Sequence, residues 1–515
     1  MAEALSARVT PRATIVSSST KRTRMERLHT PDACMNTTST RFVKGLFTEK
    51  THHTQGINGK IAVHDIFRHS MKSKEWWAAA RALRQIPRHQ RRGIVQAADL
   101  LAVDVAGIRP SLAIGERLGI QLRGSAEPSL AEVVSIGRSS ARAVIFGETS
   151  NMAEGDEVVA LESPGLRVGQ GWLGRVVDPL GRPLDGKGPL LGGQHARPTR
   201  AAAPPAATRQ RLGPPVGVGV RVLDAFCTMR EGQRIGLFAA SGIGKSTLLA
   251  TMARAAAFDV VVLGLIGERG RELREFIEDD LGPEGLARSV VVCATSDAPA
   301  ALRREAGYAS LAVAERFRDA GHRVLLLLDS VTRFALACRE IGLAAGEPPA
   351  TRGYPPSVFR ELPALLERAG PGGPGAGSIT ALMTVLVEGD DHDEPIADAV
   401  RGILDGHAVL ERRIAEAGRY PAVEVLRSLS RSAPGCLTPD QAGLVRQARK
   451  ILSLRDEVAD LVRLGAYRAG TDASVDQALR MAPRIDAMLH QARGEVSTLE
   501  EAFARLAEAL SDAPA

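Results

Sequence analysis

The sequence predicts a multidomain α/β protein with an N-terminal β-barrel, a central domain built on a parallel sheet and a helical C-terminal domain. Three patterns indicate this. Over 93–190, short Val, Ile and Leu runs are broken by Gly, Pro and Asp at intervals of roughly 8 to 12 residues, which is typical of a small barrel. From about 210 to 430, apolar runs alternate with helical segments. Residues 438–515 are helical by period and composition.

The charge of the chain is concentrated at its N-terminus. The 515 residues carry a formal net charge of +7, but residues 1–70 hold 11 Lys and Arg against 5 Asp and Glu. The remaining 445 residues hold 55 basic and 54 acidic residues, so the folded body is close to neutral. A near-neutral body argues against a nucleic-acid-binding protein, and no nucleic-acid partner is expected.

The cysteine spacing and the lack of long apolar runs favour a cytoplasmic protein. The five cysteines are scattered and none has C-x-x-C spacing, which is typical of reduced thiols and of neither a disulfide framework nor a zinc site. No apolar run approaches the roughly 18 residues of a membrane helix, and the first 20 residues lack the apolar segment of a secretory signal. We therefore expect a cytoplasmic protein.

The N-terminal 92 residues divide into two segments. Residues 1–70 are rich in Ser, Thr, Lys and Arg without a clear period, so we expect a disordered extension; a targeting arm and a translation start at Met71 are the alternatives. Residues 71–92 are predicted to contain an amphipathic helix. Its adjacent Trp76 and Trp77 suit either a partner surface or packing on their own domain.

The barrel is expected over 93–195, followed by a proline-containing linker, Ala196–Ala207. The α/β domain is expected over 196–431. Its strand candidates are apolar throughout, so both faces of the sheet should be covered, as in a parallel sheet. These candidates are QRIGLFA, DVVVLGLIG, RSVVVCATS, HRVLLLLDS and SITALMTVLVEG. The helical C-terminal domain is expected over 432–515.

The strongest single signal is the stretch AASGIGKS that ends at Ser246, because it follows a predicted strand and precedes a predicted helix. Glycines allow backbone N–H groups to turn inward around phosphates, Lys245 supplies a charge to the β- and γ-phosphates, and Ser246 offers a hydroxyl to Mg²⁺. The loop predicts binding of a nucleoside triphosphate with Mg²⁺. The predicted phosphate-binding residues are Ala240, Ser241, Gly242, Ile243, Gly244, Lys245, Ser246 and Thr247.

Two acidic residues end predicted strands of the same sheet. Asp329 closes the run VLLLLD, where a carboxylate can hold Mg²⁺ at the carboxyl edge. Glu268 follows VVVLGLI, so it can face the γ-phosphate and orient the attacking water. Arg269 beside it is expected to help hold the phosphate; the alternative is that Glu268 and Arg269 cap a loop and pair with each other.

Three further residues are weaker candidates. Arg333 lies one helical turn beyond Asp329 and is placed to bind released phosphate. Tyr420 is a candidate for stacking on the base, and Arg431 for an arginine finger that reaches a neighbouring subunit. From the sequence alone, each is more often structural, because arginines form surface ion pairs and tyrosines lie at core edges.

Motifs in a fixed order carry a family resemblance over about 90–515. Among them are GRVVDPLGRPLDG, ASGIGKS, GLIGERGRE, LLLDSVTRFA, RGYPPSVF and ILDGHAVLERRIAEAGRYPAVEV. The chain resembles the flagellar protein export ATPases and their virulence type III secretion relatives, which are similar to the catalytic subunit of rotary ATP synthases. The resemblance implies a RecA-like P-loop ATPase domain, ATP as the nucleotide, and a homohexamer with nucleotide between subunits. It also implies roles for Glu268 as catalytic glutamate, Arg431 as arginine finger and Tyr420 as adenine-stacking residue.

Within the family, the SGIGKS loop and the alphaproteobacterial character of 401–436 favour the flagellar members over the virulence-type members. The family further implies a regulatory, stator-like export protein at the N-terminal helix, an export gate at the inner membrane, and export substrates with their chaperones. The alternatives are a virulence-type secretion ATPase, an ATP synthase catalytic subunit, a non-enzymatic nucleotide-binding ring component and a hexameric RNA translocase.

Overall fold

The computed structural model describes residues 91–511, apart from 109–111, 126, 148, 150, 163–164, 241, 256 and 388–393. The predicted extension over 1–70 and the predicted helix with Trp76 and Trp77 lie outside the described residues, as do Cys34 and Ser241. Within the described part of the chain, no helix is both long and apolar enough to cross a membrane.

Six short strands close into an antiparallel barrel, as the short apolar runs over 93–190 predict. The barrel ends at Leu161, earlier than the predicted 93–195, because residues 175–177 pair with the central sheet instead. They are β1 (Arg92–Ala98), β2 (Ala102–Ala106), β3 (Arg117–Gln121), β4 (Ser129–Ile136), β5 (Ala141–Ile145) and β6 (Glu157–Leu161), in the spatial order β1-β2-β5-β4-β3-β6. Alternate side chains such as Val103, Val105, Leu118 and Ile120 fill the interior. Closure leaves this sheet without an edge strand.

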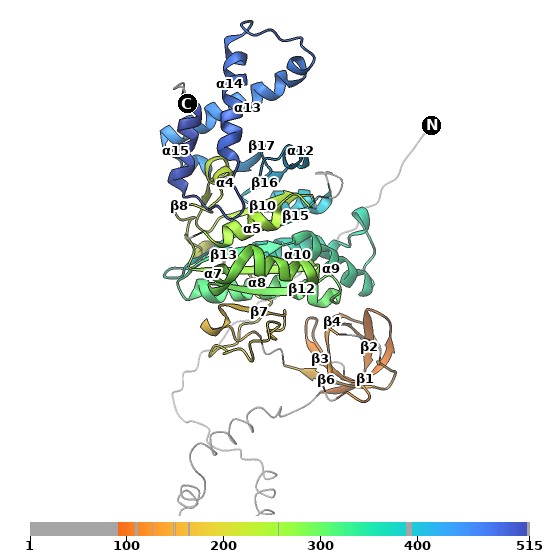
Figure 1. Cartoon of the computed structure of the whole chain (residues 1–515). Coiled ribbons are helices and arrows are strands. Elements are labelled where there is room, and N and C mark those ends of the chain that lie inside the picture. The colour runs from red at the N-terminus through yellow and green to blue at the C-terminus, as the bar shows by residue number, and fades with distance from the viewer. Residues whose placement is uncertain are drawn as a thin grey trace, which may run out of the picture. The chain divides into compact units, whose positions relative to one another are not determined.

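A mostly parallel sheet forms the centre of the chain, with the strand order β17-β16-β10-β15-β13-β11-β12-β7 (Figure 1). The central strands are β10 (Arg234–Ala239), β11 (Val260–Glu268), β12 (Ser289–Thr295), β13 (Arg323–Asp329) and β15 (Ser378–Leu386). The outer strands are β7 (Arg175–Val177), β16 (Gly406–Leu410) and the antiparallel β17 (Val423–Ser430). A two-residue strand, β14 (Gly370–Pro371), pairs with β15, and β8 (Pro215–Val216) pairs with β9 (Met229–Arg230).

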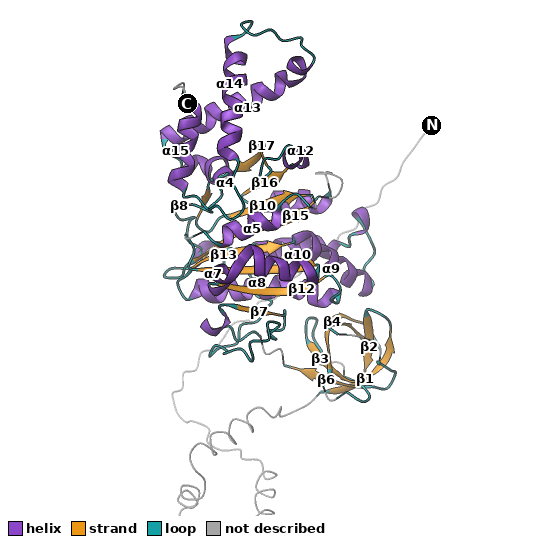
Figure 2. Cartoon of the chain, in the orientation of Figure 1, coloured by secondary structure: helices purple, strands orange, loops and turns teal. Residues whose placement is uncertain are grey.

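Both faces of this sheet are covered, which explains the uninterrupted apolar strands. On β11, Val261, Leu263 and Leu265 belong to one core, whereas Val260 and Val262 belong to the other. The second core contains α8 (Ala300–Asp319), α9 (Val331–Ala344), α10 (Pro356–Leu366) and α11 (Pro395–Ile403). The first contains α4 (Arg221–Phe226), α5 (Lys245–Ala253) and the C-terminal helices. Figure 2 shows helices along the central strands.

Short helical elements also occur in the ATPase domain: α6 (Gly270–Glu275), η3 (Phe276–Leu281) and α7 (Gly282–Ala287) follow β11, and α12 (Arg412–Glu416) lies between β16 and β17. The C-terminal region is helical, with α13 (Pro439–Arg463), α14 (Ala473–Leu489) and α15 (Leu499–Leu510). Thr438 and Thr498 begin α13 and α15 with capping boxes, which satisfy the first free N–H groups of each helix. The predicted fold class, a barrel, a parallel-sheet domain and C-terminal helices, is confirmed.

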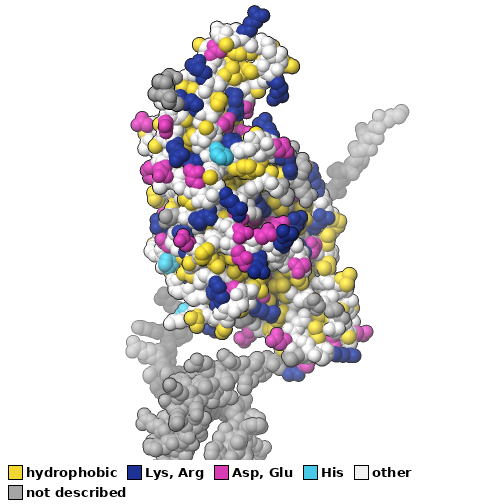
Figure 3. Space-filling view, viewed as in Figure 1, with side chains coloured by type: hydrophobic (Ala, Val, Ile, Leu, Met, Phe, Trp, Pro, Cys, Tyr) yellow, Lys and Arg dark blue, Asp and Glu magenta, His cyan; other side chains and the backbone are white. Residues whose placement is uncertain are grey.

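Charged side chains of both signs are interspersed on the face shown in Figure 3. The four cysteines in the described residues are free thiols, and Cys227, Cys293 and Cys338 are buried. Burial raises the pKa of Cys227 and Cys338 to about 12, so these thiols are protonated at neutral pH.

Candidate active site

The phosphate loop connects the end of β10 to the start of α5. Gly242 and Gly244 have φ values of 81° and 86°, a left-handed backbone that glycine adopts without the cost of a Cβ atom. Gly244 is the residue at the N-cap of α5, so the positive end of the helix opens toward this loop. Of the predicted loop residues, Ala240 and Ile243 are buried, whereas Gly242 and Ser246 are exposed.

Lys245 lies between the two carboxylates that the sequence singles out. Its Nζ atom is 2.6 Å from Oδ1 of Asp329 and 3.5 Å from Oε1 of Glu268. The parallel pairing of β11 and β13 places Leu265 beside Asp329, so both strands deliver their carboxyl ends to the same edge. The structure therefore brings Lys245, Glu268 and Asp329 together from three segments of the chain.

Burial and the neighbouring charges together set the pKa values of Lys245 and Glu268. Burial alone would lower the pKa of Lys245, but the negative charges of Asp329 and Glu268 outweigh it and raise that pKa above its usual value. Burial also raises the pKa of Glu268; Lys245 opposes this shift and Asp329 adds to it. Lys245 is therefore positively charged at neutral pH, and Glu268 keeps its proton to a higher pH than an ordinary glutamate does.

Thr384 belongs to the same site, although the sequence reading of β15 as an apolar strand did not reveal it. Its Oγ1 atom lies 2.6 Å from Oδ1 of Asp329 and 3.3 Å from the carbonyl oxygen of Leu328, and Thr384 is fully buried. In the register of β13 and β15, Met383 pairs with Leu328, which brings Thr384 beside Asp329. The hydroxyl residues within this apolar strand were the available signal, but the strand order and register were needed to show that Thr384 is the one beside Asp329.

The two arginines near Glu268 differ in their surroundings. Arg333 lies beside the site. Its backbone N–H donates to Oγ of Ser330, and its side chain packs against Gly267. Its positive charge lowers the pKa of Glu268, against the larger effect of burial. Arg269 instead forms an ion pair of 2.7 Å with Glu272 and its side chain is 78% exposed. The structure does not bring Arg269 to Lys245, nor does Arg269 pair with Glu268.

Tyr420 borders a cavity of about 340 Å³ beside the phosphate loop. A Cβ atom on Gly244 would lie 3.3 Å from the ring of Tyr420, so the ring packs against the backbone of the loop. The cavity is lined from the loop and α5 by Gly244 and Thr247, and from the C-terminal region by the segment 490–493. A cavity next to the phosphate loop with an aromatic wall suits the base of a nucleotide.

Arg431 lies at the opposite edge of its own sheet from the phosphate loop. It follows β17, its backbone N–H donates to the carbonyl oxygen of Asp405, and its side chain is exposed. Asp405 also pairs with Arg234 at the start of β10, whereas the phosphate loop follows the end of that strand. Six residues of strand span about 20 Å, so Arg431 cannot reach Lys245 of its own chain.

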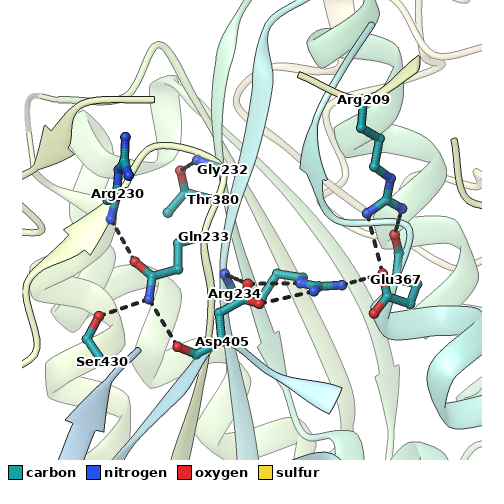
Figure 4. Close-up of polar contacts among 9 residues, drawn as sticks. All are labelled: Arg209, Arg230, Gly232, Gln233, Arg234, Glu367, Thr380, Asp405 and Ser430. Carbon is teal, nitrogen blue, oxygen red and sulfur yellow. Dashed lines mark hydrogen bonds and ion pairs between the residues drawn. The ribbon is translucent and has the colours of Figure 1, made fainter. Parts of the chain in front are cut away.

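The buried side chain of Gln233 contacts Ser430 and Asp405 (Figure 4), which are the residue before Arg431 and the backbone partner of Arg431. Its Nε2 atom donates to Oγ of Ser430 at 2.9 Å and to the carbonyl oxygen of Asp405 at 3.3 Å. Arg234 extends this network to Glu367. The network fixes the residue before Arg431 and leaves the guanidinium at the surface.

Comparisons with known proteins give the class of this protein. Residues 219–430 match the ATP synthase alpha/beta family nucleotide-binding domain, 102–162 match the beta-barrel domain of that family, and 437–508 match the T3SS EscN ATPase C-terminal domain. The last match distinguishes the chain from an ATP synthase catalytic subunit.

Individual relatives agree with these family matches. The Caulobacter vibrioides protein named flagellum-specific ATP synthase is 51% identical over 81% of this chain and 95% of its own length. The Xanthomonas euvesicatoria type 3 secretion system ATPase is 48% identical over 79% and 92%. The assembled ATPase EscN in complex with its central stalk EscO, from enteropathogenic E. coli, superposes with a TM-score of 0.74 at 38% identity, over 81% of this chain and 100% of that chain. The chain belongs to the family of flagellum-specific and type III secretion ATPases, and it is an ATP-hydrolysing enzyme, as the motifs predict.

Proposed function

We propose that this ATPase energises protein export through a flagellar type III secretion apparatus. The observation that carries ATP hydrolysis is the contact of Lys245 with Glu268 and Asp329 at the mouth of the phosphate loop. The assignment to a flagellum is supported by relatives from Caulobacter vibrioides, Agrobacterium fabrum and Rhizobium meliloti, each named flagellum-specific ATP synthase and 51–52% identical to this chain.

In the proposed reaction, the backbone of 240–246 and the N-terminus of α5 bind the phosphates, and Lys245 leaves the carboxylates to contact the β- and γ-phosphates. Glu268 accepts a hydrogen bond from the attacking water and orients this water toward the γ-phosphate. The raised pKa of Glu268 suits this role, because a stronger base polarises water better.

The residues present fit Mg²⁺. The hydroxyl of Ser246, at the start of α5, and the carboxylate of Asp329 are the hard oxygen donors that this ion prefers. When bound, Mg²⁺ supplies charge neutralisation on the transferring phosphate. The hydroxyl of Thr384 donates to Oδ1 of Asp329 and so fixes the orientation of that carboxylate.

We infer a homohexameric ring with the nucleotide between subunits. Arg431 is too far from its own phosphate loop, but a heterologous ring interface can present it to the next subunit. In this arrangement Arg431 stabilises charge on the phosphoryl group in trans. The EscN relative, which is described as assembled and in complex with its central stalk EscO, supports a ring that encloses a stalk-like partner.

The remaining partners follow from the same assignment. A regulatory, stator-like export protein would bind the helix predicted over 71–92, and the ring would work at the cytoplasmic side of the export gate, peripheral to the inner membrane. Export substrates would be released from their chaperones and unfolded there. The near-neutral charge of residues 71–515 supports partners other than nucleic acid.

The test is motility and flagellin secretion in cells whose chromosomal copy carries Lys245→Ala, with the protein level measured. Loss of both activities, with the protein present, is the expected result. Normal swimming and secretion would overturn the flagellar assignment and leave ATP hydrolysis standing.

A virulence-type injectisome is the second candidate, because the Xanthomonas type 3 secretion ATPase is nearly as similar as the flagellar relatives. Under that assignment, Lys245→Ala would abolish effector secretion while swimming remains normal.

A further inference from the structure

Arg221 is a buried cation that the hydrolysis site does not use. It is the first residue of α4 and only 2% exposed. Its Nε atom donates to the carbonyl oxygen of Met488 at 3.0 Å, its Nη2 to the carbonyl oxygen of His490, and its Nη1 to the carboxylate of Glu495. A buried guanidinium is tolerated only when its donors are satisfied, and all three acceptors lie in the segment 488–495, which comprises the last two residues of α14 and the six residues after it.

Gln491 completes this contact from the other side. Its Oε1 accepts from the backbone N–H of Arg221 at 3.0 Å, and its Nε2 donates to the carbonyl oxygens of Gly219 and Glu495 at 2.8 and 2.7 Å. The side chain is therefore used at both ends, and Gln491 is 5% exposed. Together Arg221 and Gln491, called the clamp below, join the ATPase domain to the C-terminal region.

The clamp reaches the cavity beside the phosphate loop through one further bond. The backbone N–H of Gln491 donates to the carbonyl oxygen of Tyr420 at 2.7 Å. Tyr420 and the segment 490–493 are two walls of that cavity. A shift of the 490–493 segment would therefore move both walls, whereas Lys245, Glu268 and Asp329 have no contact with the clamp among the described hydrogen bonds.

We propose that Arg221 and Gln491 are positioning residues for the base of the nucleotide. They hold Tyr420 and the 490–493 segment at the separation that a base needs, so they set the affinity for ATP and leave phosphate binding and the chemical step unchanged. This inference rests on the proposed function, because it takes the cavity as the base site of an ATPase.

The affinities for ATP and for tripolyphosphate separate binding of the base from binding of the phosphates. Stacking of a base on an aromatic ring changes affinity by about 5- to 100-fold. Tripolyphosphate has the phosphates of ATP and no base, so it reports the phosphate loop alone. Loss of the clamp is expected to weaken ATP binding by that factor and to leave tripolyphosphate binding within about 2-fold of the wild type.

The experiment measures binding of Mg-ATP and of Mg-tripolyphosphate to the full-length chain by calorimetry, in the wild type, Gln491→Ala and Arg221→Lys. We expect the KM for ATP to rise with kcat unchanged in both variants. A matched control is Arg449→Gln: Arg449 also joins a C-terminal helix to the ATPase domain, through the carbonyl oxygens of Val425, Phe226 and Ser428, but it does not line the cavity. Its ratio of ATP to tripolyphosphate affinity should equal that of the wild type.

Equal weakening of both ligands by Gln491→Ala, or no weakening of either, would overturn the proposal. Hydrogen exchange of wild-type residues 490–495 is a second measurement that needs no variant: ATP should protect these amides more than tripolyphosphate does, and equal protection would also overturn it. Failure of the proposed function has a different signature: swimming and flagellin secretion would then remain normal in cells that carry Lys245→Ala, whatever the ratio of ATP to tripolyphosphate affinity in the clamp variants.

Discussion

The ammonium nitrogen of Lys245 lies 2.6 Å from Oδ1 of Asp329, although the two residues are 84 positions apart in the chain. Both side chains are largely buried, with 13% and 5% of their surface exposed. Because the same oxygen of Asp329 also accepts from Thr384, the ion pair has a defined direction. A phosphate on the loop competes for Lys245 against this carboxylate, so binding rearranges an existing network of charges.

Replacing Glu268 by Gln is expected to lower kcat on the order of 10²- to 10⁴-fold while ATP still binds, because the amide keeps the shape of the side chain and loses the base. Steady-state hydrolysis and nucleotide binding measure the two effects separately. Glu272→Gln is the control, since Glu272 pairs with the exposed Arg269. Normal turnover in the Glu268 variant would remove Glu268 from the mechanism.

Thr384→Val removes a hydroxyl that holds Asp329, and we expect kcat to fall by about 10-fold with a higher Mg²⁺ requirement. Thr380→Val is a closely matched control: Thr380 is also fully buried on β15, but its hydroxyl accepts from the backbone N–H of Gly232 at the far end of the strand. Both variants should lose about 1 to 2 kcal/mol of unfolding free energy. A Mg²⁺ titration that is the same for both would contradict the role of Thr384.

The pH dependence of kcat should report the pKa of Glu268. Burial raises its pKa, so the acidic limb of kcat should lie above the usual value for a glutamate, because the base must be ionised to polarise water. Arg333 opposes this shift, and Arg333→Gln should therefore move the limb to still higher pH. The pH profile of Arg271→Gln, whose arginine pairs with Glu275 in solvent, should match the wild type. A shift of the acidic limb to lower pH in the Arg333 variant would contradict this assignment.

Tyr420→Ala should raise the KM for ATP by roughly 5- to 100-fold with little change in kcat, if the ring stacks on the base as we propose and does not contact the transferring phosphate. Tyr420→Phe keeps the ring and should retain most of the affinity. Comparable KM values in the Ala and Phe variants would show that the ring does not stack on the base.

Arg431 should act in trans. Arg431→Ala and Lys245→Ala are each expected to be inactive, but an equimolar mixture should recover activity at about a quarter of the interfaces, where an intact loop meets an intact arginine. Hydrolysis is measured after the two proteins are mixed and allowed to exchange subunits. A mixture that stays inactive under conditions where rings form would argue for a role of Arg431 within its own chain.

Much of the fold could be predicted because its signals are local. The turn residues of the barrel, the continuous apolar strands and the glycine-rich loop each report their own segment through backbone preference and burial period. The same is true of Lys245, Glu268 and Asp329, since residues that end parallel strands share one edge of the sheet. Their predicted chemical roles remain predictions.

The sequence by itself determined the order of the three folded regions of this protein and its family, and it predicted which residues contact ATP. Only the tertiary structure decided which of them meet. It placed Thr384 on Asp329, turned Arg269 toward Glu272, and set Arg431 at the far edge of the sheet. It also joined Arg221 to a segment about 270 residues away. The physical reason is that strand order, register and the docking of the C-terminal helices are non-local: they depend on how apolar faces of distant segments are buried together, and no short pattern records that outcome.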